Sequence, residues 1–96
     1  MPRRPNSSPQ TLAVLFALLG SNAWRHGLSL SRETGLKPGT LYPLLLRLHD
    51  AGYLESEWQP PEKPGRPPRH AYRLSDAGRA LAEERLAERG LLAKPA

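Results

Sequence analysis

The residues of this chain that are best suited to chemistry are hydrogen-bond donors and cations, and they lie in two short segments. The first segment contains Lys37, Gly39, Thr40, Tyr42 and Arg47. A lysine and the backbone N–H groups near a glycine suit a phosphate, and the two hydroxyls can donate to phosphates or base edges. An arginine can grip guanine or a phosphate with two parallel hydrogen bonds. The segment therefore favours contact with DNA over a merely solvated helix face.

The second segment, residues 63–73, contains cations and no acidic residue. Its basic residues are Lys63, Arg66, Arg69, His70 and Arg73. Five prolines lie at 60–68, and this proline-rich stretch is neither helix nor central strand. Arginines on a stiff, projecting loop can reach phosphates or the minor groove at a low entropic cost. A flexible, solvated loop is the alternative, but the shared positive charge of the two segments favours DNA.

Enzymatic and metal-binding functions are disfavoured by the residue types. Cysteine is absent, and the histidines His26, His49 and His70 lie more than twenty residues apart without an H-E-x-x-H pattern. The stretch 35–40 lacks the residue order of a phosphate-binding P-loop. We therefore expect no metal, no cofactor and no catalysis.

The length and charge of the chain agree with a small DNA-binding protein. Ninety-six residues allow one domain, and the formal net charge is +5. Residues 1–73 contain ten lysines and arginines against five acidic residues, so the excess lies outside the C-terminal part. The longest apolar run, Leu12 to Leu19, is too short to span a bilayer, and no signal peptide is evident. We expect a cytoplasmic protein that does not bind membranes.

Three helices are predicted in the first half of the chain. Ser8 and Pro9 suit the start of a helix over 9–19, with Gly20 as a left-handed terminator. A short helix over 28–34 supports the next one. That helix, over 38–51, has a stripe of leucines at spacings of three and four, and Pro43 lies within its DNA-contacting segment. Two short helices joined by a tight turn predict a helix-turn-helix.

A hairpin and a last helix are predicted in the second half. Residues 54–59 and 70–74 alternate with period two around the proline loop, so the loop tip, residues 59–69, should project as a wing. Ser75 caps a helix from Asp76 to about Arg89. The order of elements predicts a mainly α (α+β) fold, a winged helix-turn-helix with a two-stranded wing and an extra C-terminal helix. We expect a disordered arm over 1–8, a DNA-binding domain over 9–75 and a dimerisation helix and tail over 76–96.

The helix over 9–19 is apolar on every side, which in so small a domain predicts cover from a second chain. The final helix has small residues that permit close approach. We expect a homodimer in which these two helices pack together. The interface residues predicted from this pattern are Leu12, Leu15, Leu19, Leu81 and Leu91.

Two blocks of this sequence resemble the PadR family of bacterial transcriptional regulators. They are the T-G-L-x-x-G-T-L-Y-P block that begins at Thr34 and the G-R-P-x-R-x-x-Y-x-L-S block that begins at Gly65. The resemblance covers roughly residues 9–90. Three positions depart from it: Leu46 where polar or basic residues are usual, His49 where an acid is usual, and Ala71 where an aromatic is usual.

The resemblance implies a homodimeric winged helix that binds an operator in double-stranded DNA, usually as a repressor, and hence a bacterial, nucleoid-associated protein. Members of the family often respond to small aromatic or lipophilic compounds near the dimer interface. Trp24 and Phe16 are the residues that we assign to such an effector. The alternative is a winged-helix protein-interaction module that uses the surfaces of Leu46, Tyr42 and Trp58. Salt separates the two, because DNA binding weakens steeply as salt rises and an apolar interface does not.

Overall fold

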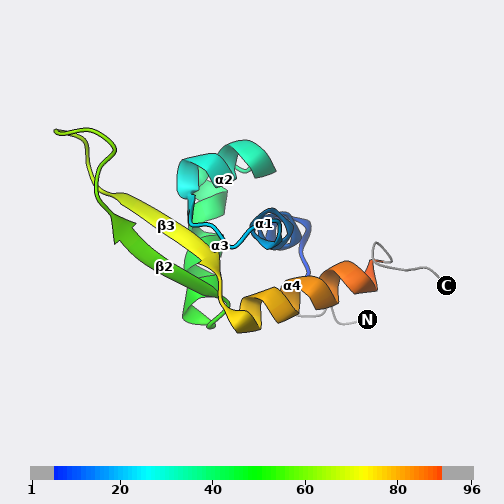
Figure 1. The fold of residues 1–96 in the computed structure, drawn as a ribbon. Coiled ribbons are helices and arrows are strands. Elements are labelled where there is room, and N and C mark those ends of the chain that lie inside the picture. The colour runs from blue at the N-terminus through cyan, green and yellow to red at the C-terminus, as the bar shows by residue number, and fades with distance from the viewer. Residues whose placement is uncertain (1–5, 90–96) are drawn as a thin grey trace.

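The computed structural model describes residues 6–89, which form helices packed on a small antiparallel sheet (Figure 1). The first three helices are α1 (Pro9–Leu19), α2 (Gly27–Thr34) and α3 (Pro38–Asp50). The Ser8 hydroxyl caps α1 by accepting from the Thr11 backbone N–H at 3.2 Å. α2 ends at Gly35, whose φ of 77° is the left-handed conformation that glycine adopts easily. These are the predicted helices, to within a residue or two at their ends.

The end of α1 differs from the prediction. Gly20 has a φ of −66° and stays right-handed, and its backbone N–H bonds to the Leu18 carbonyl. The prediction of a left-handed terminator at Gly20 was therefore wrong. The last turn of α1 is tightened, so the Leu18 carbonyl is hydrogen-bonded without any residue in the left-handed conformation.

The sheet has three strands, β1 (Arg25–His26), β2 (Leu54–Gln59) and β3 (Arg69–Leu74), in the order β1-β3-β2. β2 and β3 form the predicted hairpin, in a register from Leu54 opposite Leu74 to Gln59 opposite Arg69. β1 was not predicted. Its two residues pair with Tyr72 and Ala71, so β3 becomes the central strand and the base of the wing is joined to the start of α2.

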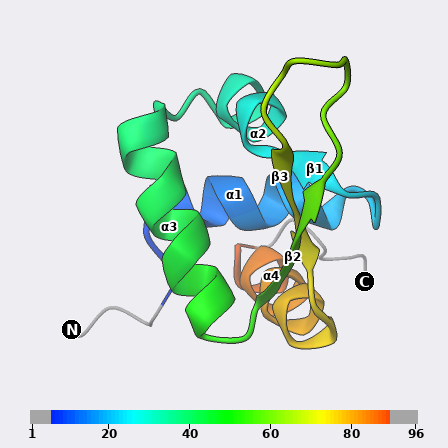
Figure 2. The ribbon, with the colours of Figure 1, turned by 90° about the vertical axis from the view of Figure 1, so that its left-hand side faces the viewer.

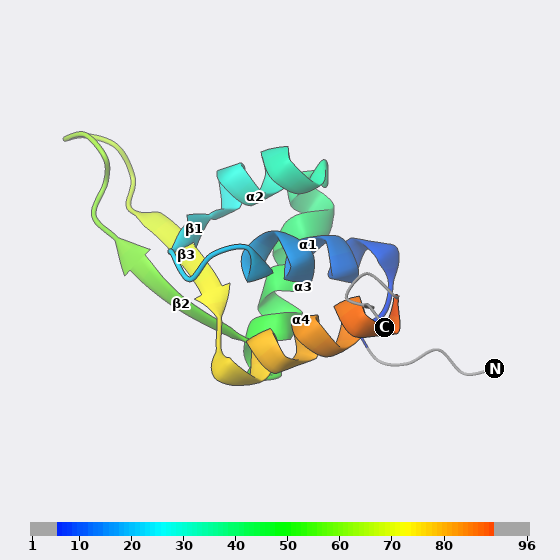
Figure 3. The ribbon, with the colours of Figure 1, turned by 45° about the vertical axis from the view of Figure 1, so that its right-hand side comes forward.

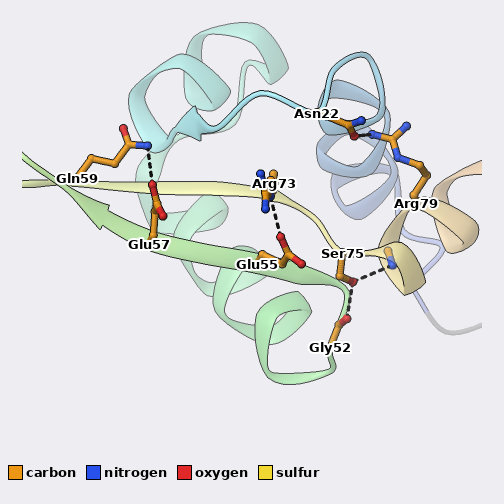
Figure 4. A network of polar contacts seen from close by, with 9 residues as sticks. Asn22, Gly52, Glu55, Glu57, Gln59, Arg73, Ser75 and Arg79 are labelled. Carbon is orange, nitrogen blue, oxygen red and sulfur yellow. Dashed lines mark hydrogen bonds and ion pairs between the residues drawn. The ribbon is translucent and has the colours of Figure 1, made fainter.

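The last helix, α4 (Asp76–Glu88), is fixed to the base of the wing. The Ser75 hydroxyl accepts from the Gly78 backbone N–H at 3.0 Å and donates to the Gly52 carbonyl at 2.6 Å (Figure 4). A Cβ at Gly78 would collide with the Tyr53 carbonyl, so the helix approaches the start of β2 closely because this residue is glycine.

One hydrophobic core joins all four helices and the sheet. α1 lies between α2 and α4, and the hairpin projects from the edge of this packed body (Figures 1 and 3). The fully buried leucines are Leu15, Leu18, Leu30, Leu41, Leu45 and Leu48. α4 contributes Leu81 and Ala82 to the same core, so it is part of the folded unit. Residues 1–5 of the predicted arm and 90–96 of the predicted tail lie outside the described residues.

Within residues 6–89, no helix is both long enough and apolar enough to cross a lipid bilayer.

Candidate nucleic-acid interface

α3 turns its leucines into the core and leaves its other face open. Leu41, Leu44, Leu45 and Leu48 are buried, as their spacing predicts. Among the predicted contact residues of the first turns, Lys37, Gly39, Thr40 and Pro43 are all exposed. No side chain caps the N-terminus of α3. An uncapped helix start beside a lysine is suited to an anionic group.

Tyr42 is half-exposed and lies against the start of α2. Its ring packs so closely there that a Cβ at Gly27 would collide with the tyrosine hydroxyl. The side chain also lines a cavity of about 520 Å³ together with Trp58 and Tyr72 of the wing. Tyr42 thus connects the surface of α3 with the wing, and Gly27 makes room for it.

Arg47 lies on a different part of the α3 surface from the first turn. It is seven residues beyond Thr40, roughly 10 Å along the axis at about 1.5 Å per residue. The residue is exposed, and its guanidinium donates to the Thr11 hydroxyl at 3.3 Å, which ties it to α1. Arg47 therefore lies well away from Thr40 along the helix axis.

The wing loop, residues 60–68, presents two cations at a tight turn. The Arg66 backbone N–H donates to the Lys63 carbonyl at 3.2 Å, and Gly65 has a φ of 87°. The residue order Lys63-Pro64-Gly65-Arg66, with proline second and a left-handed glycine third, is typical of a type II turn. Both cations are exposed. Arg69, at the start of β3, is half-buried.

The wing loop and the first turn of α3 lie at the same end of the molecule, with α2 between them (Figure 2). Figure 1 shows the same arrangement from the side, with the loop projecting beyond α2. Most of the residues that the sequence assigns to DNA therefore lie on one face.

Arg73 does not belong to this face. Its Nε donates to the Glu55 carboxylate at 2.7 Å, and its guanidinium lies over the Trp24 ring at 4.3 Å (Figure 4). The residue is near the base of the wing, far from the loop tip. An acid and an aromatic ring of its own chain engage this cation, which disfavours the predicted contact of Arg73 with DNA.

An aromatic cluster at the wing was not predicted. Trp58 and His70 stack with ring centroids 4.4 Å apart, and Tyr72 lies beside them with its hydroxyl 2.9 Å from His70 Nδ1. Burial raises the pKa of Tyr72 above its usual value, and the nearby Tyr42 raises it further. The alternating pattern places these residues on one face of each strand. Their register across a long loop could not be derived from the sequence.

A family model agrees with this geometry. The model described as "Transcriptional regulator PadR-like family" matches residues 16–84, most of the chain. This chain belongs to the PadR-like family of transcriptional regulators. It is therefore a DNA-binding transcription regulator with a winged-helix fold. A search of curated proteins found no match.

Solved structures of similar proteins have the same fold. A PadR family transcriptional regulator from Eggerthella lenta is 30% identical, with a TM-score of 0.69 over 88% of this chain and 77% of that one. A PadR-like transcription factor from Bacteroides fragilis is 27% identical, with a TM-score of 0.70 over 84% of this chain and 80% of that one. A PadR-like regulator from Bacillus cereus, 24% identical, shares the fold with a TM-score of 0.67 over 84% and 81% of the two chains.

The predicted dimer residues of this PadR-like regulator differ in their exposure. Leu15 is fully buried in the core of its own chain, so it has no surface to offer a partner, and Leu81 is only 8% exposed. Leu12 and Leu19 are partly exposed on α1. Leu91 lies outside the described residues. The predicted dimer interface on α1 thus depends on Leu12 and Leu19. Leu15 cannot contribute to this interface, because it has no exposed surface.

The two residues predicted to bind an effector, Trp24 and Phe16, each lie against an arginine of their own chain. Trp24 packs under Arg73, and Phe16 on α1 lies 5.5 Å from the Arg89 guanidinium. Neither residue lines the cavity beside Tyr42, the cavity beside Arg32 or a third one beside Glu55 and Arg73. In the same part of the chain, no group of three or more potential ligands is placed to hold a metal. That the protein has no catalytic activity stays a prediction.

Proposed function

We propose that this PadR-like regulator binds a specific duplex sequence as a homodimer and represses transcription by covering that site. The first turn of α3 enters the major groove, with Thr40 toward the base edges and Lys37 on a phosphate. The wing loop then lies along the flanking backbone or minor groove. A two-fold dimer binds two half-sites about one helical turn apart, roughly 34 Å.

One observation carries this proposal. α3 buries every leucine of its stripe and leaves an open, uncapped first turn, and this turn lies at the same end of the molecule as a loop that contains Lys63 and Arg66 (Figure 2). The fold makes no other use of the exposed first-turn residues. A reading helix and a backbone-gripping wing need this combination of fixed position and free side chains.

A protein-interaction module remains the second candidate, because three exposed apolar side chains favour it. Leu28, Leu46 and Trp58 are 60–68% exposed. Leu28 and Trp58 line cavities that also contain arginine, so their surroundings suit a polyanion better than an apolar partner. Leu46 on α3 is the residue that this alternative explains best.

Alanine variants of α3 test the proposed reading helix. Thr40→Ala should leave the melting temperature nearly unchanged, whereas Tyr42→Ala should lower it, because the tyrosine ring packs against Gly27 of α2. Both variants should weaken binding to DNA sequences selected by the wild-type protein. Arg47→Ala should lower affinity for all sequences alike if it contacts a phosphate, or lower discrimination at one position by roughly 1–3 kcal/mol if it contacts a base.

Leu45→Ala is the control, because this fully buried residue should cost about 2–5 kcal/mol of stability. Full DNA affinity in all three surface variants would mean that α3 does not read DNA. The protein-interaction module would then be the better account.

A further inference from the structure

A second cavity lies between α2 and the wing loop. Its volume is about 300 Å³. The lining residues from the side of α2 are His26, Leu28, Ser29 and Arg32, and those from the wing are Glu62, Arg66, Pro67 and Arg69. The cavity is therefore formed by two elements that the long wing loop brings together.

Its arginines differ from most other arginines of residues 6–89 in having no partner in that part of the chain. Arg25 pairs with Glu33, and Arg73 pairs with Glu55. Arg79 donates to Asn22 (Figure 4).

Within residues 6–89, by contrast, the guanidinium groups of Arg32, Arg66 and Arg69 have no hydrogen-bond or ion-pair partner. The Nε of Arg69 is also buried. Three unpartnered cations thus line one cavity.

The positive charge of this cavity is suited to an anion with several acceptor oxygens. Like charges held together repel one another, and the only acid on the lining is Glu62. A phosphate neutralises this excess and accepts from more than one guanidinium, and the Ser29 hydroxyl can donate to it as well. A buried, unpaired Nε is costly until an acceptor reaches it.

We propose that Arg32 and Ser29 of α2 join Arg66 and Arg69 of the wing in a phosphate-binding site for the DNA backbone. This inference rests on the proposed DNA-binding function and extends it to α2, for which the sequence indicates only a supporting role. α2 then contacts the phosphates of the strand that passes between α3 and the wing.

The larger cavity shows where this strand continues. The two cavities share the lining residues His26, Leu28 and Arg69, and the larger one ends at Tyr42 of α3. A backbone that enters at Arg32 therefore follows one groove to the recognition helix. The exposed Leu28 and Trp58 side chains face the deoxyribose groups along this path, where apolar contact is suitable.

The experiment measures how salt weakens binding to a mixed-sequence 30-base-pair duplex, by fluorescence anisotropy of the labelled DNA. Arg32→Ala should weaken binding to every duplex and lower the log–log salt slope by about 0.9 per chain, the loss of one phosphate contact. Arg32→Lys keeps the charge and should keep the slope. Because Arg32 is exposed, the melting temperature of both variants should match the wild type.

Arg89→Ala is the matched control, since it removes the same charge from the other end of the molecule, after α4. The log–log salt slope of DNA binding by Arg89→Ala should equal that of the wild type. An unchanged slope in Arg32→Ala would overturn the inference and leave the proposed function intact. Failure of the wild-type protein to bind any duplex would overturn both.

Free anions are tested with inorganic phosphate on the wild-type protein. If phosphate at millimolar concentration raises the melting temperature of the wild type but not of Arg32→Ala, while the DNA salt slopes of the two agree, the cavity binds a free anion. That result would overturn its assignment to the DNA backbone.

Discussion

Gly39 lies in the first turn of α3, where nothing in the fold requires a glycine. Its φ is not positive, and a Cβ built on it meets no atom within 4 Å. Alanine is favoured over glycine inside a helix by up to about 1 kcal/mol. We therefore expect Gly39→Ala to raise the melting temperature slightly and to weaken DNA binding, because the methyl group keeps the helix start from a phosphate. A stabilised variant with unchanged DNA affinity would show that the backbone of Gly39 does not approach DNA.

Tyr72 predicts how stability changes at alkaline pH. In the unfolded chain a tyrosine loses its proton near its ordinary pKa of 10.0, whereas burial raises the pKa of Tyr72 in the folded state. The folded state therefore keeps a proton that the unfolded state loses. The free energy of unfolding should be constant with respect to this group below pH 10 and fall as the pH rises from 10 toward the folded pKa.

The measurement is urea denaturation of the wild type and Tyr72→Phe at pH values between about 9 and 11. The wild type should lose stability more steeply with pH than the variant, although the variant lacks the hydroxyl that bonds to His70 and starts from a lower value. Parallel pH curves for the two proteins would contradict a raised pKa at Tyr72.

At the scale of elements, the wing arginines predict a contact that does not depend on DNA sequence. The double variant Arg66→Ala, Arg69→Ala should lower affinity for all duplexes alike. If each residue neutralises one phosphate, the log–log salt slope per half-site should fall by about 1.8. The measurement is DNA affinity over a series of salt concentrations. A slope equal to that of the wild type would mean that the loop is a solvated spacer.

The helices and the hairpin were predictable from the sequence because local signals set them. Ser8 and Ser75 cap helices whose first turns need an acceptor, and Gly35 ends α2 with a positive φ. β1 escaped prediction because two residues have no periodicity, and it exists only through pairing with β3. Gly20 was misjudged because the last turn of a helix can close without a left-handed residue.

The candidate site was predictable where one element alone defines it. The leucine stripe of α3 determines which of its residues are exposed, so Thr40 and Lys37 follow from the spacing. The partners of Arg73 could not be predicted from the sequence, because they come from another strand and from the segment before β1. The cavity that contains Arg32 depends on the approach of the wing loop to α2, which no local pattern encodes.

For the whole molecule, the exposed part of α1 predicts how two chains associate. Leu12, Phe16 and Leu19 are spaced four and three residues apart along α1, so they lie on one face of the helix. They pack against the core and remain partly exposed to solvent. Leu12→Glu should give a folded monomer in sedimentation equilibrium with greatly reduced DNA affinity, because burying a charge in the interface is costly. Removal of residues 76–96 is a poor test, since α4 supplies Leu81 and Ala82 to the core of the single chain.

Leu46→Glu is the control for this substitution. Leu46 is 61% exposed on α3, away from the apolar stripe of α1, so the same change there should leave the dimer intact. A Leu12→Glu protein that sediments as a dimer would mean that the chains associate through another surface.

The most direct test of sequence-specific recognition is selection of bound sequences from a random duplex pool. The wild-type protein should enrich one motif with two-fold symmetry and half-sites about one helical turn apart. Thr40→Ala should lose preference within each half-site, and Arg66→Ala should enrich the same motif with a lower yield. A wild-type pool without an enriched motif, or an unchanged motif in Thr40→Ala, would contradict the account in which α3 reads the bases and the wing grips the backbone.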